Sequence, residues 1–189
     1  MPNLTPTVLS TARLRLRWMT EADAPAHFAV FSDPEVTRFW SSGPWTDMQQ
    51  AVDAIGRELA AYRDGSAVRF AVELANQPGL IGTVSLHRFV DQSRRCEIGY
   101  AFGREHWNRG YAAEAVRAVL DYGFRVLDLN RVEADIDPRN LASARVLERL
   151  GFRKEGFLPE RWIVQGEPAD TLLYGLLRRY WDALPLVAS

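Results

Sequence analysis

The segment from Glu97 to Ala113 constrains the fold most, because it runs from a strand pattern through a glycine-containing turn into the start of a helix. The first N–H groups of a helix lack intrahelical partners and carry partial positive charge, so such a turn can bind a pyrophosphate. A helix that merely follows a turn is the simpler explanation of the glycine taken alone. The expected donors are the backbone amides of Arg109, Gly110, Tyr111, Ala112 and Ala113.

The residues after Gly110 predict an amphipathic helix. Apolar side chains recur at helical spacing from Ala112 to Leu120, whereas Glu114 and Arg117 mark the opposite face. Such a helix packs its apolar side against another element. We therefore expect it to connect two strands of one sheet.

Composition excludes several classes of protein. With 189 residues, the chain fits one domain, and 23 basic against 24 acidic residues give no overall charge that would favour nucleic acid or an anionic membrane surface. A single cysteine, Cys96, excludes an intramolecular disulfide, and three scattered histidines give no zinc signature. No stretch approaches the ~20 apolar residues of a membrane span, and the N-terminus lacks a signal-peptide pattern. We expect a soluble, cytoplasmic, metal-free domain over residues 1–189.

Periodicity and turn residues give the order β, α, α, three β, α, β, α, β, β, which is a mixed sheet in an α/β or α+β domain. Thr46 and Gln49 resemble a capping box at the start of the second helix. The connection through the Gly110 helix should make the strands at 95–102 and 132–136 parallel. The expected strands are residues 13–18, 67–74, 80–89, 95–102, 132–136, 152–157 and 170–177, and the expected helices begin after Thr20, Thr46, Gly110 and Asn140.

Several motifs in register resemble the GNAT superfamily of acyl-CoA-dependent N-acyltransferases, and within it the RimJ and RimL type that acetylates protein N-termini. The likeness covers nearly the whole chain. The motifs are T-A-R-L-R-L-R, I-G-T-V-S-L, E-I-G-Y, W-N-R-G-Y-A-A-E-A and N-L-A-S-A-R-V-L-E-R-L-G-F.

The resemblance implies how acetyl-CoA would bind. The fourth strand would bulge and splay from the fifth, and the pantetheine arm would fill the gap by hydrogen bonding to that strand. The turn before the Gly110 helix would hold the pyrophosphate. Trp107 stands where many superfamily members have Gln or Arg, as in the RimL type. The implied cofactor-binding residues are Tyr100, Ala101, Phe102, Trp107, Asn108, Arg109, Gly110, Tyr111, Ala112, Ala113, Asn140 and Ser143.

Acetyl transfer to an amine requires a base, a donor to the carbonyl oxygen and a source of a proton for the thiolate. Glu97 is the candidate base, acting directly or through water, because it stands at the expected bulge. A solvated strand glutamate is the competing explanation. A free backbone N–H near Tyr100 could stabilise the oxyanion.

Ser143 is the candidate acid, since the RimL type has a serine in this role. Ser143 and Asn140 could equally be a first-turn residue and a helix cap. Leu147 stands where the acid tyrosine of the spermidine acetyltransferases would fall, which puts a polyamine acceptor in doubt. Tyr111 and Tyr100 are the remaining hydroxyl candidates.

Other reactive residues fit a structural role better. Cys96 is expected in the core because neighbouring strand residues face opposite ways, and His87 and His106 lack a readable carboxylate partner. The aromatic loop at 38–45 is either core or a wall over the acceptor amine. Its candidate substrate-binding residues are Phe39, Trp40 and Trp45.

The sequence therefore predicts an acetyl-CoA-dependent N-acetyltransferase that forms a ternary complex and is attacked directly by a primary amine, with a protein N-terminal α-amine as the expected acceptor. A small-molecule acetyltransferase for an amino acid, antibiotic or polyamine is one alternative. A non-catalytic acyl-CoA-binding module is another. The aromatic loop and terminal strands could line a homodimer interface, as in RimL-like relatives.

Overall fold

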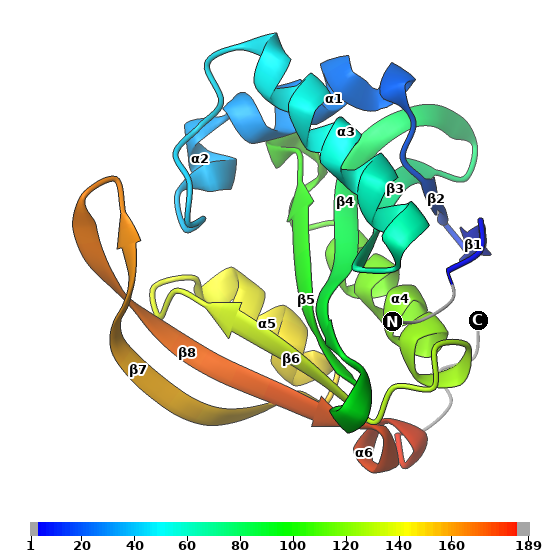
Figure 1. The fold of residues 1–189 in the computed structure, drawn as a ribbon, viewed down its shortest axis with the longest axis vertical. Helices are drawn as coiled ribbons and strands as arrows, with labels where there is room; N and C mark the ends of the chain where they lie inside the picture. Colours follow the sequence, from blue (N-terminus) through cyan, green and yellow to red (C-terminus); the bar gives the residue numbers. More distant parts are fainter. Residues whose placement is uncertain (1–3, 185–189) are drawn as a thin grey trace.

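The computed structural model describes residues 4–184, in which eight strands form one sheet with the order β1-β2-β3-β4-β5-β6-β8-β7 (Figure 1). Neighbouring strands are antiparallel except for β5 and β6, which are parallel as predicted. The strands are β1 (Leu9–Ser10), β2 (Leu14–Trp18), β3 (Ala67–Leu74), β4 (Gln77–Val90), β5 (Arg95–Phe102), β6 (Arg131–Ile136), β7 (Arg153–Val164) and β8 (Glu167–Leu177).

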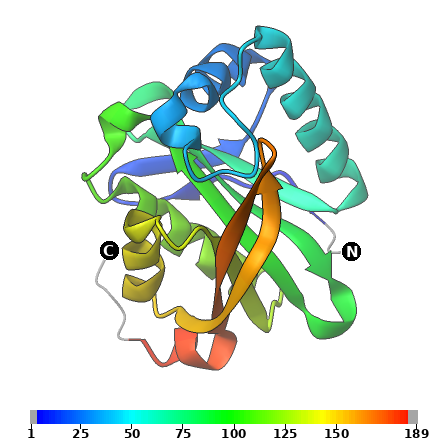
Figure 2. The ribbon, with the colours of Figure 1, turned by 90° about the vertical axis from the view of Figure 1, so that its left-hand side faces the viewer.

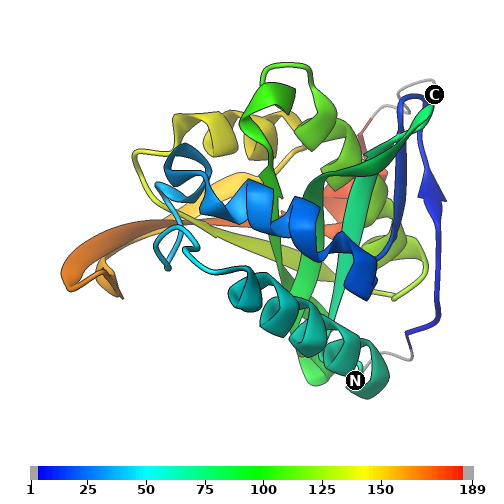
Figure 3. The ribbon, with the colours of Figure 1, turned by 90° about the horizontal axis from the view of Figure 1, so that it is seen from above.

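Helices cover both faces of this sheet. In Figures 2 and 3, α1 and α3 lie on one side, whereas α4 and α5 lie on the other. Three short 3₁₀ turns lie at Glu21–Asp23, Asp91–Ser93 and Arg104–His106. The helices are α1 (Ala24–Ser32), α2 (Pro34–Thr37), α3 (Met48–Asp64), α4 (Tyr111–Arg125), α5 (Leu141–Arg149) and α6 (Arg178–Asp182).

Each face has its own apolar core. The core under α4 and α5 includes Phe70, Phe124 and Leu147, all nearly inaccessible to solvent. The core under α1 and α3 includes Phe31 and Ile55, with the aromatic loop packed against its rim. Side chains alternate between the faces along each strand, so the strands that carry the site are fixed from both sides.

The predicted β and α segments are confirmed, with three short additions, one shifted helix cap and an earlier start of β4, which begins at Gln77 rather than at residue 80. Strand β1, the one-turn helix α2 and the terminal helix α6 had no periodic signal because they are too short to repeat a pattern. The helix cap of α3 is Asp47, not Thr46. Its carboxylate accepts from Gln49 N at 2.8 Å, while the Gln50 side chain accepts from Asp47 N at 3.0 Å.

The last two strands are longer than predicted. They form a hairpin that extends away from the body of the sheet toward the aromatic loop (Figures 1 and 2). Both faces of β7 are largely exposed, so its sequence lacks the alternation of apolar and polar residues that predicts a strand over its full length. The predicted turn at Gln165 and Gly166 is confirmed, and both residues have positive φ.

No helix within residues 4–184 is long and apolar enough to cross a membrane. Over the same range, no three His, Cys, Asp or Glu side chains lie close enough together to hold a metal ion.

Candidate active site

The centre of the site is a gap between two parallel strands. Strands β5 and β6 pair over Arg95–Glu97 and Arg131–Glu133, and beyond these pairs each continues without the other. The register irregularity that accompanies this splay lies in β4, between His87 and Val90, rather than in β5 where the bulge was expected. Arg88 takes a φ of 54° at this bulge, directly beside Glu97.

The alternation of backbone hydrogen bonds decides which groups of β5 face the gap. Gly103 N donates to Ile81 O of β4 at 2.9 Å, so the odd-numbered residues of β5 bond to β4. The amide and carbonyl groups of Tyr100 and Phe102 therefore point toward β6. Those of Ala101 point toward its β4 partner Thr83, which differs from the expectation that Ala101 would bind pantetheine through its backbone.

The turn before α4 has the geometry that an anion site needs. Gly110 is the N-cap, with φ 79° and ψ 0°, and Asn108 also has a positive φ. A Cβ on Gly110 would have one near neighbour, Nη2 of Arg13 at 3.3 Å. Trp107 lies at the end of β5, where its Nε1 donates to Phe102 O at 2.8 Å. The open edge of β5 and this turn together fit a phosphorylated, extended cofactor such as coenzyme A.

Arg13 anchors the same turn. Its Nη1 donates to Arg109 O at 3.0 Å, its guanidinium forms an ion pair with Glu114 at 2.6 Å, and it lies 4.9 Å from the centre of the Tyr111 ring. The hydroxyl of Thr11 also donates to Glu114 at 2.6 Å. Hydrogen bonds and an ion pair thus connect the polar face of α4 to the turn between β1 and β2.

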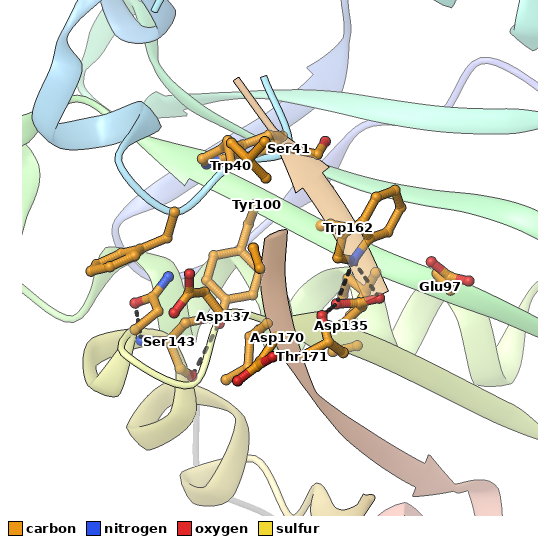
Figure 4. Close-up of a pocket in the computed structure, with 18 of the residues that line it drawn as sticks. Trp40, Ser41, Glu97, Tyr100, Asp135, Asp137, Ser143, Trp162, Asp170 and Thr171 are labelled. Atoms are coloured by element: carbon orange, nitrogen blue, oxygen red, sulfur yellow. Dashed lines mark hydrogen bonds between the residues drawn. The ribbon is translucent and has the colours of Figure 1, made fainter. Parts of the chain in front are cut away.

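An open cleft of about 240 Å³ lies between the aromatic loop, the splayed strands, the start of α5 and the β7–β8 hairpin (Figure 4). The turn residues from Trp107 to Ala113 are not among its lining residues and lie beyond the end of β5. The predicted residues that line it are Phe39, Trp40, Glu97, Tyr100, Asn140 and Ser143.

Glu97 is partly shielded, with 18% of its side chain exposed. Arg88 Nη1 lies 3.0 Å from Glu97 Oε2, and His87 Nε2 lies 3.9 Å from the same oxygen. Burial, followed by the charges of Arg69 and Arg88, lowers the pKa of His87 to about 4, so this imidazole is neutral at pH 7. Arg88 is therefore the cation that faces the candidate base.

Ser143 lies in the first turn of α5. Its amide donates to the capping oxygen of Asn140 at 3.1 Å, so the helix cap fixes the position of the serine. Its Oγ lies 2.7 Å from the hydroxyl of Tyr100, which reaches across from β5 (Figure 4). Leu147 of the same helix is fully buried in the core.

The aromatic loop divides between cleft and core. Phe39 and Trp40 line the cleft, whereas Trp45 stacks on Phe31 with ring centres 4.8 Å apart and contacts the edge of His27. Trp45 therefore supports the wall from behind and is not among the residues that line the cleft. Cys96 is buried, as predicted, and burial raises the pKa of its thiol.

The structure adds a polar wall that sequence reasoning missed. Asp135 of β6 accepts from Thr171 Oγ1 at 2.6 Å and from Trp162 Nε1 at 3.2 Å (Figure 4). It also accepts from Arg161 Nε at 3.2 Å. Asp137 and Asp170 line the same cleft. In the sequence, Asp135 was only the polar residue of an alternating strand, and no local signal linked it to the hairpin.

The splayed parallel strands and the glycine-capped start of α4 are the features that the resemblance to the acyl-CoA-dependent N-acyltransferases implies. Comparison with known proteins shows the family. Residues 13–153 match the acetyltransferase (GNAT) domain. The chain is 40% identical over 171 residues to the uncharacterized N-acetyltransferase p20 of Bacillus licheniformis, covering 90% of this chain and 96% of that protein.

Two further comparisons extend this result. A crystal structure of a GNAT-family acetyltransferase from Bacillus anthracis superimposes with a TM-score of 0.83 at 28% identity, covering 92% of this chain and 99% of that chain. The [ribosomal protein uS5]-alanine N-acetyltransferase of Escherichia coli is 30% identical over 121 residues, covering 64% of this chain and 62% of that protein. The chain belongs to the GNAT acetyltransferase family and is an N-acetyltransferase.

Proposed function

We propose that this enzyme transfers the acetyl group of acetyl-CoA to a protein N-terminal α-amine, by direct attack in a ternary complex. The observation that carries the proposal is the gap between β5 and β6, which opens into a cleft containing both Glu97 and Ser143. The similarity to the E. coli uS5-alanine N-acetyltransferase supports the choice of acceptor.

The chain's own groups would hold the donor at two places. The gap-facing carbonyl of Tyr100 and the gap-facing amide of Phe102 would bond the pantetheine arm as an added strand would, and Asn140 would contact it from the start of α5. The amides from Arg109 to Ala113 would bind the pyrophosphate at the N-terminus of α4. When bound, acetyl-CoA supplies an activated acyl group as a thioester.

Three groups would then act on the reaction. Glu97 would take a proton from the ammonium, directly or through water, to give the free amine. The gap-facing amide of Tyr100 would stabilise the negative charge on the carbonyl oxygen. Ser143 would give its hydroxyl proton to sulfur as the C–S bond breaks and regain one from solvent. The attacking nitrogen loses a second proton as the tetrahedral adduct collapses to the amide. This second proton balances the one delivered to sulfur, and the first is released from Glu97 to solvent.

The cleft is lined by charged groups of both signs. The carboxylates of Glu97, Asp135, Asp137 and Asp170 share it with the guanidiniums of Arg38, Arg88 and Arg139. An ion pair with Arg139 lowers the pKa of Asp137, so that this carboxylate stays ionised at pH 7. The carboxylates would attract a cationic amine, and the guanidiniums beside them would weaken that attraction. Phe39 and Trp40 offer apolar surface for the part of the acceptor next to the amine.

A small-molecule amine is the second candidate acceptor, because the aromatic loop lies against the turn of the β7–β8 hairpin beside the cleft. Gly43 of the aromatic loop lies against the hairpin turn, where an added Cβ would be 2.8 Å from Gln165 Nε2. This contact narrows the space for an extended peptide. Release of free thiol from acetyl-CoA, measured with peptides of different N-terminal residues and with a panel of small amines, separates the two acceptors.

The catalytic assignments are tested by E97Q and S143A, with E133Q as the control. Glu133 faces Glu97 in the strand register but forms ion pairs with Arg95 and Arg131 and does not line the cleft. We expect E97Q and S143A each to lower kcat about 100-fold and E133Q to leave it within threefold. Acetyl-CoA binding by calorimetry without turnover of any acceptor would instead indicate a non-catalytic binding module.

A homodimer is also part of the proposal. Strand β7 is an edge of the sheet, and Phe157 and Ile163 on it are 51% and 66% exposed. Apolar side chains on an unpaired edge favour pairing with another chain. Light scattering on the purified enzyme gives its mass, and a monomer at micromolar concentration would contradict this part of the proposal.

A further inference from the structure

Ser143 can protonate sulfur only if its hydroxyl proton points into the cleft. A serine in the first turns of a helix commonly turns its hydroxyl back to a backbone carbonyl, which would direct the proton away from a substrate. Some other group must therefore control the orientation of this hydroxyl. The structure supplies one in Tyr100, whose hydroxyl lies 2.7 Å from Ser143 Oγ.

Two acceptors compete for the single proton of the Tyr100 hydroxyl. One is Ser143 Oγ at 2.7 Å, and the other is the Ser143 carbonyl oxygen at 3.3 Å. The shorter contact is at the optimal length for a hydroxyl pair, and the longer one is beyond the usual range. Either hydroxyl can donate in the 2.7 Å contact. If Ser143 donated to Tyr100, the Tyr100 proton would be left with the 3.3 Å contact alone, whereas a Tyr100 proton placed on Ser143 Oγ makes the shorter bond and leaves the serine proton for the cleft.

We propose that Tyr100 is a positioning residue that donates to Ser143 Oγ and thereby directs the serine proton toward the sulfur of the leaving thiolate. The inference rests on the proposed role of Ser143 as the acid. Tyr100 transfers no proton in this scheme. The serine proton goes to sulfur, and the serine is restored through solvent by the second proton, which the attacking nitrogen loses as the adduct collapses to the amide.

The surroundings keep Tyr100 in the donating form. Burial raises the pKa of its hydroxyl to about 12, although the hydrogen bond with Ser143 lowers it, so the phenol stays protonated over the working range of pH. Its ring packs against the core under α4 and α5, which fixes the hydroxyl relative to α5. Leu147, one turn further along α5, is fully buried and provides no hydroxyl of its own.

The test is a double-mutant cycle of Y100F and S143A on kcat at saturating substrates. We expect Y100F to lower kcat about tenfold in the wild-type background, as loss of one orienting hydrogen bond predicts, and less than twofold in the S143A background. The KM for acetyl-CoA should change less than threefold. Y62F is the matched control, because Tyr62 is another buried tyrosine, whose hydroxyl accepts from Met19 N at 3.0 Å away from the cleft.

A second measurement does not depend on turnover. Urea denaturation of the unliganded proteins should give the same midpoint for Y100F and for the double mutant, since either change removes the same hydrogen bond. Y62F should lower the midpoint and leave kcat unchanged.

The outcomes distinguish a wrong role for Ser143 from a wrong role for Tyr100. If S143A has wild-type kcat, the acid assignment of the proposed function fails, and this inference fails with it. If S143A is slow but Y100F lowers kcat equally in both backgrounds, or lowers it in neither, the acid assignment stands and the positioning role of Tyr100 is overturned.

Discussion

Replacing Gly110 with alanine tests whether the turn before α4 binds the pyrophosphate. Gly110 has φ 79° and ψ 0°, a conformation that costs a residue with a Cβ about 1–2 kcal/mol. The added Cβ would also lie 3.3 Å from Nη2 of Arg13, but this side chain is half exposed and can move. Strain of the left-handed backbone therefore determines the expected loss in the free energy of unfolding, about 1–2 kcal/mol.

The same methyl group would stand where the backbone must approach the phosphate. A hydrogen bond to a charged group contributes about 1.5–3 kcal/mol, so loss of one at the helix start should weaken coenzyme A binding roughly tenfold or more. The control is G65A, because Gly65 ends α3 with nearly the same dihedrals, φ 74° and ψ 12°. Urea denaturation measures the strain in both variants, and calorimetry measures the affinity for coenzyme A.

We expect both variants to lose similar stability and G110A alone to lose affinity. If G110A binds coenzyme A as tightly as G65A does, the turn does not hold the pyrophosphate, and the phosphate site must be sought elsewhere. If G110A costs no stability, the left-handed conformation is wrong.

Three further changes test other parts of the structure. W162F removes the donor 3.2 Å from Asp135 and should raise the KM for the acceptor about fivefold, with calorimetry showing unchanged coenzyme A affinity. L147A empties a fully buried core position and should cost about 2–5 kcal/mol in urea denaturation. Burial opposes ionisation of Asp23, but hydrogen bonds from Arg17 outweigh it and lower the pKa of Asp23 in the folded state. The stabilisation is present above the ordinary carboxyl pKa of about 4 and is lost as pH falls through the lower folded value, so the wild type should lose its advantage over D23N on acidification.

Much of the fold could be predicted because its long elements carry local signals. Strands β3 and β5 have the predicted bounds, since β-rich runs end at clear turns, and Asn140 caps α5 as its side chain predicts. The bounds of elements with weak sequence patterns were harder to predict. The exposed strand β7 has no alternation over its full length. The cap of α3 was predicted one residue early, at Thr46, because Asp47 and Gln50 have the same spacing as Thr46 and Gln49.

Candidate site residues could be predicted where they lie in one local motif. They were missed where the fold brings distant segments together. Glu97 and Ser143 lie in local motifs, and both line the cleft. Asp135 takes its hydrogen bonds from residues 27 and 36 positions further along, which no spacing rule connects. Trp40 and Trp45 are equivalent in sequence and both pack against Phe31, but Trp40 also lines the cleft whereas Trp45 does not.

The β4 bulge turns Arg88 toward Glu97, so the candidate base already faces a guanidinium, which also lies 5.6 Å from the centre of the Trp162 ring. If Glu97 is the base, an ammonium acceptor would displace this guanidinium from the carboxylate, and one positive charge would replace another. The displaced guanidinium would stay near the Trp162 ring and would return to the carboxylate once the neutral amide product has left.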